Sequence, residues 1–398
     1  MCGCSHAESA LARVVVIGAG SEPFFEWQER TADALWDLAA RLAPWPPQTA
    51  RDALAVTRAG LGWVFGPGGL GASRVWPLVL DALSPATRRL RGQSAELRTF
   101  VDGQLLISAQ LPSERANCLY AAAALDLPRA GAAHCAGGVG RIAETIAAAV
   151  LASGGEIRYR TEAVSVVWER GRPSGVVTAD GETIPADTVV ANTTPWDARR
   201  IFGSENTRCL RHLSRRPEGN GAFMLYAGID GSGLPDDLPL HHQVIAGRPY
   251  GSGNTVFASL SPAWDAERAP EGHRSLTLST HTPLQHWWDL HKSDRAGYDA
   301  LRAELTDKVL ETAERAIPLL RERAVRVFPA TPLTFQRFTH REAGWVGGFP
   351  QRTLLSALGP RVGHGAWLVG DSISPGQSTA AVALSGMRVA SMILAESS

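Results

Sequence analysis

The chain is poor in the features that mark membrane-spanning, secreted and nucleic-acid-binding proteins. It has no unbroken run of about 18 apolar residues, so no membrane-spanning helix is expected. The first residues do not show a basic region followed by an apolar core, so no secretory signal is expected either. Lys and Arg total 39, as do Asp and Glu, and this balance gives no electrostatic argument for nucleic acid. A cytoplasmic location is the expectation.

Cysteine is also sparse. The five cysteines are scattered, and an odd, small number favours a reducing compartment over a disulfide framework. Cys2 and Cys4 stand close to His6, but no second ligand pair follows at zinc spacing. We therefore expect no metal site, and we interpret residues 1–11 as a tail.

Motifs of hydrolytic catalysis are missing as well. No Ser/His/Asp order and no HExxH helix is visible. His241 and His242 are adjacent on an expected strand, where neighbouring side chains point to opposite faces, so they do not share a metal. Asp102 and Asp265 are candidate acid–base groups, but each abuts turn-forming residues, which favours a role in turns. The catalytic residues stay unassigned.

Tryptophan, in contrast, is abundant, with 12 in the chain. Five of them lie in irregular or Gly/Pro-rich surroundings: Trp45, Trp63, Trp76, Trp287 and Trp288. The usual burial of aromatic residues favours a place in hydrophobic cores. An apolar substrate cleft or a membrane interface is the alternative.

The N-terminal part contains half of a dinucleotide-binding signature. Residues 13–17 predict a buried parallel strand, and Gly18, Ala19 and Gly20 follow it as a candidate phosphate loop. The third glycine of the complete signature is missing, and a helix is expected from Phe24 to Leu42. Asp37 has the spacing of a ribose-binding acid but lies inside that helix, so we interpret it as a solvated residue.

The middle and the end of the chain each predict strand–loop–helix units. Residues 137–195 predict a glycine-rich turn, a helix and several strands, including one at 156–160 and one at 187–192. Residues 367–371 predict a buried strand that ends in Gly370 and Asp371. A small-residue loop to Ser378 and a helix from Thr379 to Glu396 follow.

This last unit is suited to a nucleotide cofactor. The Asp371 carboxylate suits sugar or ribityl hydroxyl groups. The amides of Ser378, Thr379 and Ala380, with the positive end of the helix dipole, suit an anion or a reduced flavin. An ordinary strand–loop–helix unit is the alternative that the pattern alone leaves open.

A family resemblance adds to this pattern. The segments Gly365–Ser372, Pro375–Ala380 and Leu384–Gly386 resemble the C-terminal FAD motif of the phytoene desaturase family. That family includes carotenoid desaturases, isomerases and ketolases, with retinol saturases as relatives. The block 137–195 resembles the same family's second nucleotide-binding segment. The resemblance implies that the backbone of Ala163 and Val164 contacts the adenine of FAD.

The resemblance also implies a fold and a domain plan. The implied class is α/β, a Rossmann-like FAD-binding domain of the glutathione-reductase type with an inserted mixed α+β substrate domain. The FAD-binding domain would combine residues 12–20, 128–203 and 362–398. The substrate domain would combine 21–127 and 204–361.

The resemblance further indicates an internal deletion. From Ser21 onward the chain is similar to a family segment that normally lies far downstream of the glycine loop. The first helix, the ribose-binding acid and the second glycine cluster have no counterpart. Weak FAD binding is therefore expected.

The expected function is that of an FAD-dependent oxidoreductase acting on a long apolar polyene, such as a carotenoid, at a membrane surface. Two alternatives remain: a catalytically impaired family member that binds a lipid or a partner, and an amine oxidase-like flavoenzyme. Desaturation, isomerisation, saturation and ketolation are not distinguished by the sequence. No nucleic-acid partner is expected.

Overall fold

The chain forms two compact units in the computed structural model, which describes residues 21–67, 69–129, 131, 133–235, 237–354 and 357–397. The first unit comprises Gly131–Thr161 and Arg216–Val346, and the second comprises the described part of Val15–Ala130 with Glu162–Arg215 and Gly347–Ser398. The predicted phosphate loop of Gly18, Ala19 and Gly20 lies outside the described residues.

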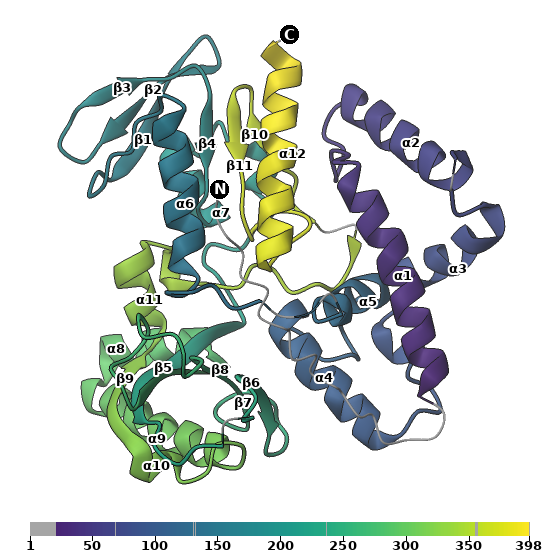
Figure 1. Ribbon diagram of the computed structural model, residues 1–398. Helices are drawn as coiled ribbons and strands as arrows, with labels where there is room; N and C mark the ends of the chain where they lie inside the picture. Colours follow the sequence, from purple (N-terminus) through teal and green to yellow (C-terminus); the bar gives the residue numbers. More distant parts are fainter. Residues whose placement is uncertain are drawn as a thin grey trace. The chain divides into compact units, whose positions relative to one another are not determined.

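The first unit is built on an antiparallel sheet with the strand order β6-β7-β8-β5-β9 (Figure 1). The strands are β5 (Asn220–Asp230), β6 (His241–Ile245), β7 (Thr255–Leu260), β8 (His273–Pro283) and β9 (Ala324–Ala330). Exposed and buried residues alternate along β5 and β8, as they do in a sheet with one face on a core.

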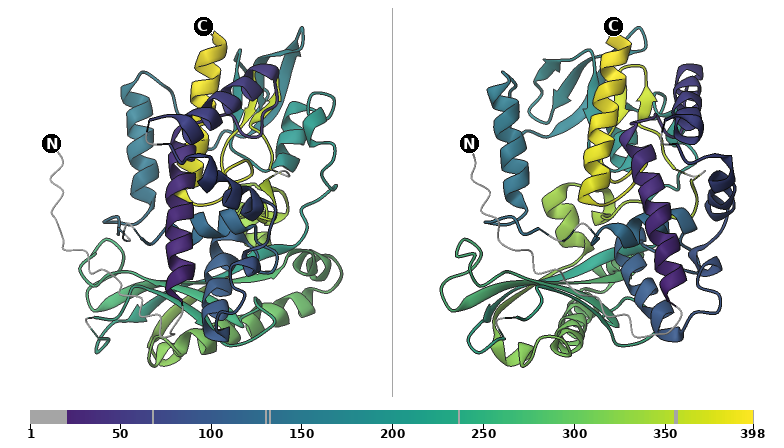
Figure 2. Two further views of the ribbon diagram at one scale, coloured as in Figure 1. Left: turned by 90° about the vertical axis from the view of Figure 1, so that its right-hand side faces the viewer. Right: turned by 45° about the vertical axis from the view of Figure 1, so that its right-hand side comes forward.

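Helices cover that buried face of the sheet, as Figures 1 and 2 show. The helices of this unit are α6 (Gly140–Ala152), α8 (Leu284–Ser293), α9 (Arg295–Glu314), α10 (Leu320–Arg323) and α11 (Pro332–Thr339), with the turn η3 (Glu342–Gly344). Trp287 of α8 stacks on Phe223 of β5 at 5.7 Å between ring centroids and packs edge-on against Tyr298. Burying each such side chain contributes about 1.5–3 kcal/mol.

The second unit begins with a group of helices. They are α1 (Glu22–Ala40), α2 (Ala50–Phe65), α3 (Ala72–Ala82), α4 (Ala95–Ala109) and α5 (Cys118–Asp126), with the turn η1 (Ala86–Arg88). Side-chain caps fix where three of them begin. Thr49 and Asp52 form a capping box on α2, Ser94 caps α4 and Asn117 caps α5. Asp37 lies exposed on α1 beside Arg41, as predicted.

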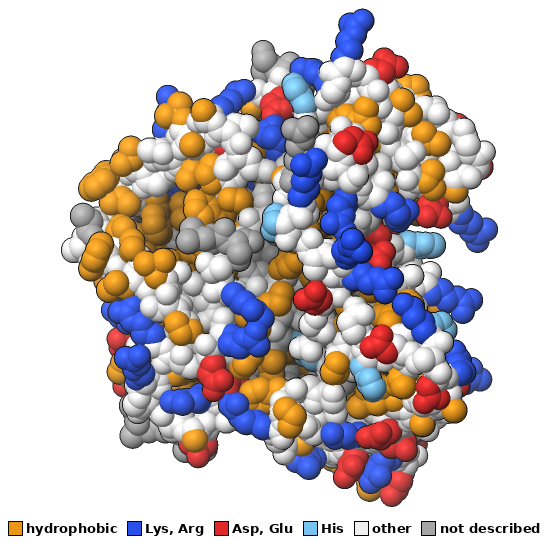
Figure 3. Space-filling model, turned by 180° about the vertical axis from the view of Figure 1, so that it is seen from behind, with side chains coloured by type: hydrophobic (Ala, Val, Ile, Leu, Met, Phe, Trp, Pro, Cys, Tyr) orange, Lys and Arg blue, Asp and Glu red, His pale blue; other side chains and the backbone are white. Residues whose placement is uncertain are grey.

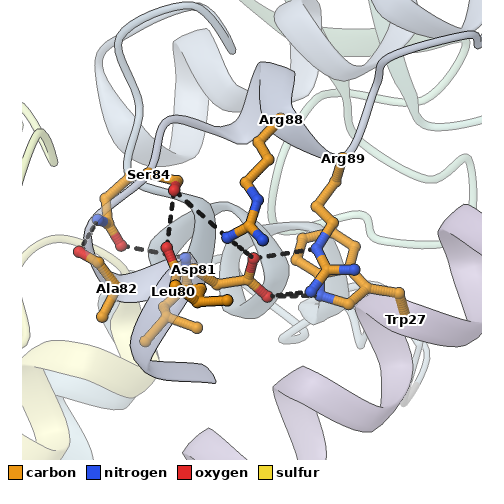
Figure 4. Close-up of polar contacts among 9 residues, drawn as sticks. Trp27, Leu80, Asp81, Ala82, Ser84, Arg88 and Arg89 are labelled. Carbon is orange, nitrogen blue, oxygen red and sulfur yellow. Dashed lines mark hydrogen bonds and ion pairs between the residues drawn. The ribbon is translucent and has the colours of Figure 1, made fainter. Parts of the chain in front are cut away.

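A buried carboxylate holds these helices together (Figure 4). Asp81 of α3 is fully buried and accepts hydrogen bonds from Arg89, at 2.7 Å to Nη2, and from the indole of Trp27 on α1, at 3.0 Å. Arg88 contributes a longer ion pair of 3.5 Å. The guanidinium of Arg89 also lies over the Trp27 ring. The cluster links α1, α3 and η1 through one charge that needs all its partners.

Two small sheets complete the second unit. The first is antiparallel, with β1 (Ala163–Glu169), β2 (Arg172–Thr178) and β3 (Thr183–Pro185). The second has the order β10-β11-β4, with β4 (Val189–Ala191), β10 (Arg361–Gly363) and β11 (Ala366–Leu368). The remaining helices are α7 (Pro195–Phe202), η2 (Arg208–Leu210) and α12 (Thr379–Ser397).

The pairing of β11 with β4 matters for the site. The two strands run parallel, with Leu368 opposite Ala191. The end of the block 137–195 and the C-terminal motif therefore share a sheet, as the motifs predict. The predicted strand at 156–160 is wrong, because the segment is irregular and Arg160 has a φ of +57°. Among the described residues no segment pairs with it, and a strand exists only through such pairing.

The two units divide the chain differently from the domains expected from the sequence. The helices of 21–127 group with the C-terminal motif, and α6 groups with the five-stranded sheet. The expected domain boundaries remain a prediction.

The C-terminal helix α12 bears on the expectation that no helix of this chain spans a membrane. Thr379–Glu396 is long and apolar enough to span a membrane by length and composition, and 22% of that stretch is buried. No unbroken apolar run stands there, since Arg388, two serines and Gly386 interrupt it, but the average over the stretch is apolar. A helix packed on the core of a folded domain passes the same test. The buried residues Ala381, Ser385, Arg388 and Val389 form one stripe of α12.

Candidate functional site

The candidate site begins where two parallel strands end. Residues 192–193 follow β4, and Gly370 and Asp371 follow β11. The amide of Val369 donates to the carbonyl of Ala191 at 3.0 Å, which carries the pairing to the strand ends. In α/β folds, ligands bind in the crevice beyond the carboxyl ends of parallel strands, because loops rather than strands border that edge.

Gly370 is required by this geometry. Its φ is +96°, and a Cβ atom at this position would lie 2.2 Å from the Oδ1 atom of Asn192. Its amide also donates to the hydroxyl of Ser385 on α12. A side chain at position 370 would displace the Asn192 side chain and would strain a backbone conformation that favours glycine.

Asp371 lies beside a small cavity of about 30 Å³, which Ser372, Gly376 and Tyr120 also line. The Ser372 hydroxyl donates to the Asp371 carboxylate at 3.3 Å. Gly348 packs so tightly here that a Cβ atom on it would lie 2.4 Å from the Asp371 carbonyl oxygen. The residue is partly exposed, and a carboxylate is suited to accept a hydrogen bond from a ligand hydroxyl.

The loop from Ser374 to Ser378 is held by side chains from both sides. Gln377 donates to the carbonyl of Ile107 at 2.6 Å and accepts from Gln110 at 3.0 Å. Gly376 has a φ of +111°, and a Cβ atom there would lie 2.1 Å from the Gln351 amide nitrogen. The loop is therefore fixed against the end of α4 before α12 begins.

The start of α12 has the predicted form. The Ser378 hydroxyl accepts from the amide of Ala381 at 3.1 Å and caps the helix. Thr379 and Ala380 are exposed in the first turn, where helix amides have no acceptor within the helix. The geometry agrees with an anion-facing helix start.

The same loop also lines an apolar cavity of about 360 Å³. Ser374, Pro375, Gln377 and Ser378 form part of its wall, and most of the rest comes from α1, α2, α5 and α12. The helices contribute mainly apolar side chains: Leu35, Leu38, Val56, Leu119, Ala123 and Leu384. Tyr120 and Gln351 line this cavity and also the small cavity beside Asp371. Apolar space and cofactor motif therefore meet at one loop.

Tryptophan rings form much of the apolar wall. The indole nitrogens of Trp36 and Trp63 donate to Asp126 and to the carbonyl of Ala34, each at 3.0 Å. Trp45 donates to the carbonyl of Leu354 at 3.4 Å. Each polar N–H group is thus bonded within the protein, and the rings supply apolar surface to the cavity.

Of the five tryptophans singled out in the sequence, some lie in a hydrophobic core and others line the apolar cavity. Trp45 and Trp63 line the cavity, and Trp287 is fully buried in a core. Trp288 donates to the carbonyl of Ala343 at 2.9 Å, and Trp76 is exposed on α3.

Other predicted site residues lie elsewhere. Ala163 and Val164 open β1, where Ala163 pairs with Thr178 and is exposed. Their contact with an adenine stays a prediction. Asp265 accepts from the Gly137 amide at 3.0 Å and contacts His134 at 2.7 Å, while Asp102 accepts from the Ser113 amide. Asp265 binds loop amides, as a turn-shaping residue does. The expected turn role of Asp102 is wrong, because Asp102 lies buried within α4 and holds the segment that follows this helix.

The sequence interpretation missed three residues of the site. Tyr120 and Trp36 come from helices that the sequence did not connect to the motif. Arg388 is buried in α12 and donates to the Ser374 carbonyl. It is the one charged residue between Thr379 and Ala395, so the sequence did hold a signal for it.

The groups at this site are suited to bind part of a flavin dinucleotide. The closely packed glycines, the accessible carboxylate and the capped helix start supply a backbone cradle, a hydroxyl acceptor and a positive dipole end. In the residues that the structure describes, no group of three His, Cys, Asp or Glu side chains is placed to hold a metal.

Comparison with known proteins gives one family and two kinds of relatives. The family model of flavin-containing amine oxidoreductases matches residues 92–394. The chloroplastic prolycopene isomerases of Daucus carota and Arabidopsis thaliana are each 28% identical over 316 residues, which covers 76% of this chain and 50% and 52% of those proteins. A neurosporene-forming phytoene desaturase of Cereibacter sphaeroides is 28% identical over 268 residues, with 61% and 48% covered. The chain spans about half the length of these relatives.

Solved structures show the same fold. An oxidoreductase from Methanosarcina mazei has a TM-score of 0.55 at 15% identity, covering 80% of this chain and 71% of that chain. Putrescine oxidase bound to putrescine has a TM-score of 0.52 at 14% identity, covering 95% and 77%. These matches confirm the predicted α/β fold class. With the family model and the relatives, they confirm the resemblance to FAD-dependent oxidoreductases of the carotenoid desaturase type.

Proposed function

The chain belongs to the flavin-containing amine oxidoreductase family, and we propose that it is an FAD-dependent oxidoreductase acting on a long apolar polyene. The observation that carries the proposal is the shared loop: Ser374, Pro375 and Gln377 line the apolar cavity, and the Asp371 motif lies directly before them. Such a loop is suited to present a cofactor to an apolar substrate.

FAD, when bound, supplies the two-electron acceptor, and the protein supplies position and an apolar surrounding. The Asp371 carboxylate would accept a hydrogen bond from a ribityl or ribose hydroxyl. The first-turn amides of α12, at the positive end of the helix dipole, would stabilise negative charge on the cofactor. The tryptophan rings and leucines exclude water from the substrate space.

The charge of the cavity argues against an amine as substrate. The lining residues that the structure describes include no carboxylate, and Arg388 brings a positive charge. A substrate ammonium group would meet repulsion there and would have no acid to pair with. A polyene carries no charge along its chain and needs only apolar contact. Relatives of both kinds, isomerases and desaturases, are named for carotenoid substrates.

An exposed apolar surface supports work at a membrane. Leu61 and Phe65 of α2 are 54% and 70% exposed, and Trp76 and Leu83, in and after α3, are 67% and 73% exposed. Hydrophobic side chains gather on this side in Figure 3, at the upper left. α2 also lines the cavity through Val56 and Trp63. We propose peripheral contact with a lipid surface through α2 and α3, which would give apolar substrates a route to the cavity.

The membrane proposal is tested by sedimentation with anionic lipid vesicles. Trp76→Glu with Leu83→Glu should release most of the bound protein, because charged groups resist burial in lipid. Val325→Glu, which changes an exposed apolar residue of β9, is the matched control and should sediment like the wild type. Equal sedimentation of all three would contradict the proposal.

The activity is tested with phytoene and prolycopene in liposomes, with FAD added and the products separated by chromatography. Conversion of either polyene that is lost in Asp371→Ala and kept in Asp37→Ala supports the proposal. Bound flavin without conversion of any polyene would instead favour the catalytically impaired alternative. Oxidation of putrescine would favour the amine oxidase-like one.

A further inference from the structure

A buried, uncompensated positive charge stands in the wall of the apolar cavity. Arg388 is 6% exposed and, among the described residues that line this cavity, is the only ionised side chain. It belongs to the buried stripe of α12, beside Ser385 and Val389, so the packing of the helix holds it in place.

The guanidinium group of Arg388 is only partly hydrogen-bonded. Its Nη2 atom donates to the carbonyl of Ser374, and its Nε atom is buried without a hydrogen-bond partner. Within the described parts of the chain, no carboxylate forms an ion pair with it. Burial lowers the pKa of the guanidinium to about 10, so it still carries its charge at neutral pH. A buried cation without an anion is costly to the folded protein.

Tyr120 adds a second donor at the same place. It lines the cavity from α5 and is close enough to Arg388 for each to influence the ionisation of the other. Burial raises the pKa of its phenol to about 12, so the hydroxyl stays protonated and available as a donor. Arg388 and Tyr120 together bring a positive charge and a hydroxyl donor to a cavity whose lining residues are mostly apolar.

We infer that the cavity takes a long apolar molecule that ends in a carboxylate, with the carboxylate on Arg388 and Tyr120. This inference rests on the proposed function and narrows its substrate class from polyenes in general to polyene acids. A guanidinium matches a carboxylate in shape and in charge, because two parallel N–H groups meet two oxygens. A single negative charge balances the single positive charge, whereas a diphosphate would bring excess charge into apolar surroundings.

The test compares a polyene acid with its own ester. All-trans-retinoic acid and methyl retinoate share one carbon skeleton and differ in the charge of the end group. Trp36, Trp45 and Trp63 in the cavity wall report binding through quenching of their fluorescence. The acid should bind the purified protein at least about tenfold more tightly than the ester, since charge-assisted hydrogen bonds are the stronger ones.

Two substitutions assign that preference to residues. Arg388→Met keeps the length and removes the charge, so it should abolish the preference for the acid and leave the affinity for the ester. Tyr120→Phe removes one hydroxyl from a side chain that keeps its shape, so it should reduce the acid preference in a protein that folds. Ser391→Ala, on the exposed part of α12, is the control and should retain the preference.

The outcomes separate this inference from the proposed function. Equal binding of acid and ester by the wild type would overturn the inference and leave polyene binding intact. Displacement of the acid by added FAD would also overturn it, because Arg388 would then serve the phosphates of the cofactor. Failure of acid, ester and phytoene alike to bind would refute the proposed function itself.

Discussion

Asp81 should be the residue on which the helical part of the second unit depends. It is fully buried, and Arg89, Arg88 and the Trp27 indole all donate to it (Figure 4). Asp81→Ala leaves a buried indole N–H without an acceptor, at a cost of about 1–3 kcal/mol. It also leaves two guanidinium groups without their anion, and breaking a buried pair in this way costs about 3–5 kcal/mol.

Hydration of the two arginines reduces the loss of stability. Their side chains are 34% and 30% exposed, so water replaces some of the lost contact. We therefore expect a loss near the lower end, about 3 kcal/mol. With a urea dependence of about 3 kcal/mol per M for a protein of this size, the unfolding midpoint should fall by about 1 M. Asp81→Asn retains an acceptor for the indole and should lose less.

The assay is urea unfolding followed by tryptophan fluorescence. Asp37→Ala is the matched control, because Asp37 forms an exposed pair with Arg41 on the same helix that carries Trp27. It should change the midpoint very little. A midpoint for Asp81→Ala that equals the midpoint of the control would refute the reasoning, since the buried carboxylate would then contribute nothing to stability.

Two other predictions follow from single positions. Gly370→Ala should lower the flavin content of the purified protein, because the added Cβ atom would lie 2.2 Å from Asn192. In the control Gly386→Ala on α12, the added Cβ atom meets no atom within 4 Å, so this variant should retain its flavin. Equal flavin absorbance of the two variants would contradict the prediction. Hydrogen bonds from His134 and from the Gly137 and Glu267 amides hold the pKa of Asp265 below its usual 3.8. Its stabilisation is therefore present at neutral pH and lost as the pH falls through that lowered pKa. Asp265→Asn should lower the melting temperature at pH 7, and the melting temperatures of variant and wild type should converge on acidification below about pH 4. A difference in melting temperature that does not change with pH would show that the Asp265 charge does not contribute to stability.

Elements with a strong local pattern could be predicted from the sequence. The helix of 24–42 and the C-terminal unit match α1, β11 and α12 within a few residues. Their apolar periodicity and their glycines are local, so no knowledge of the fold is needed.

Features that depend on distant partners could not be predicted. The segment 156–160 reads as a strand in its composition, but a strand needs a neighbour, which the local sequence does not specify. The cavity is assembled mainly from α1, α2, α5, α12 and the loop before α12, and no local pattern shows that these meet. Arg388 was visible as one charge in an apolar helix, but its burial and the lack of an acid near it appear only in three dimensions.

If the Asp371 motif holds FAD beside the apolar cavity, titration of the apo-protein with FAD, followed by the flavin absorbance, should show saturable binding. Asp37→Ala should retain this binding, and Asp371→Ala should weaken it strongly. Because the first nucleotide-binding unit is incomplete in sequence, the dissociation constant should lie above about 1 μM. Absence of saturable binding, or equal affinity in Asp371→Ala and the wild type, would contradict this prediction. A constant below that value would show that the proposed deletion does not affect the cofactor.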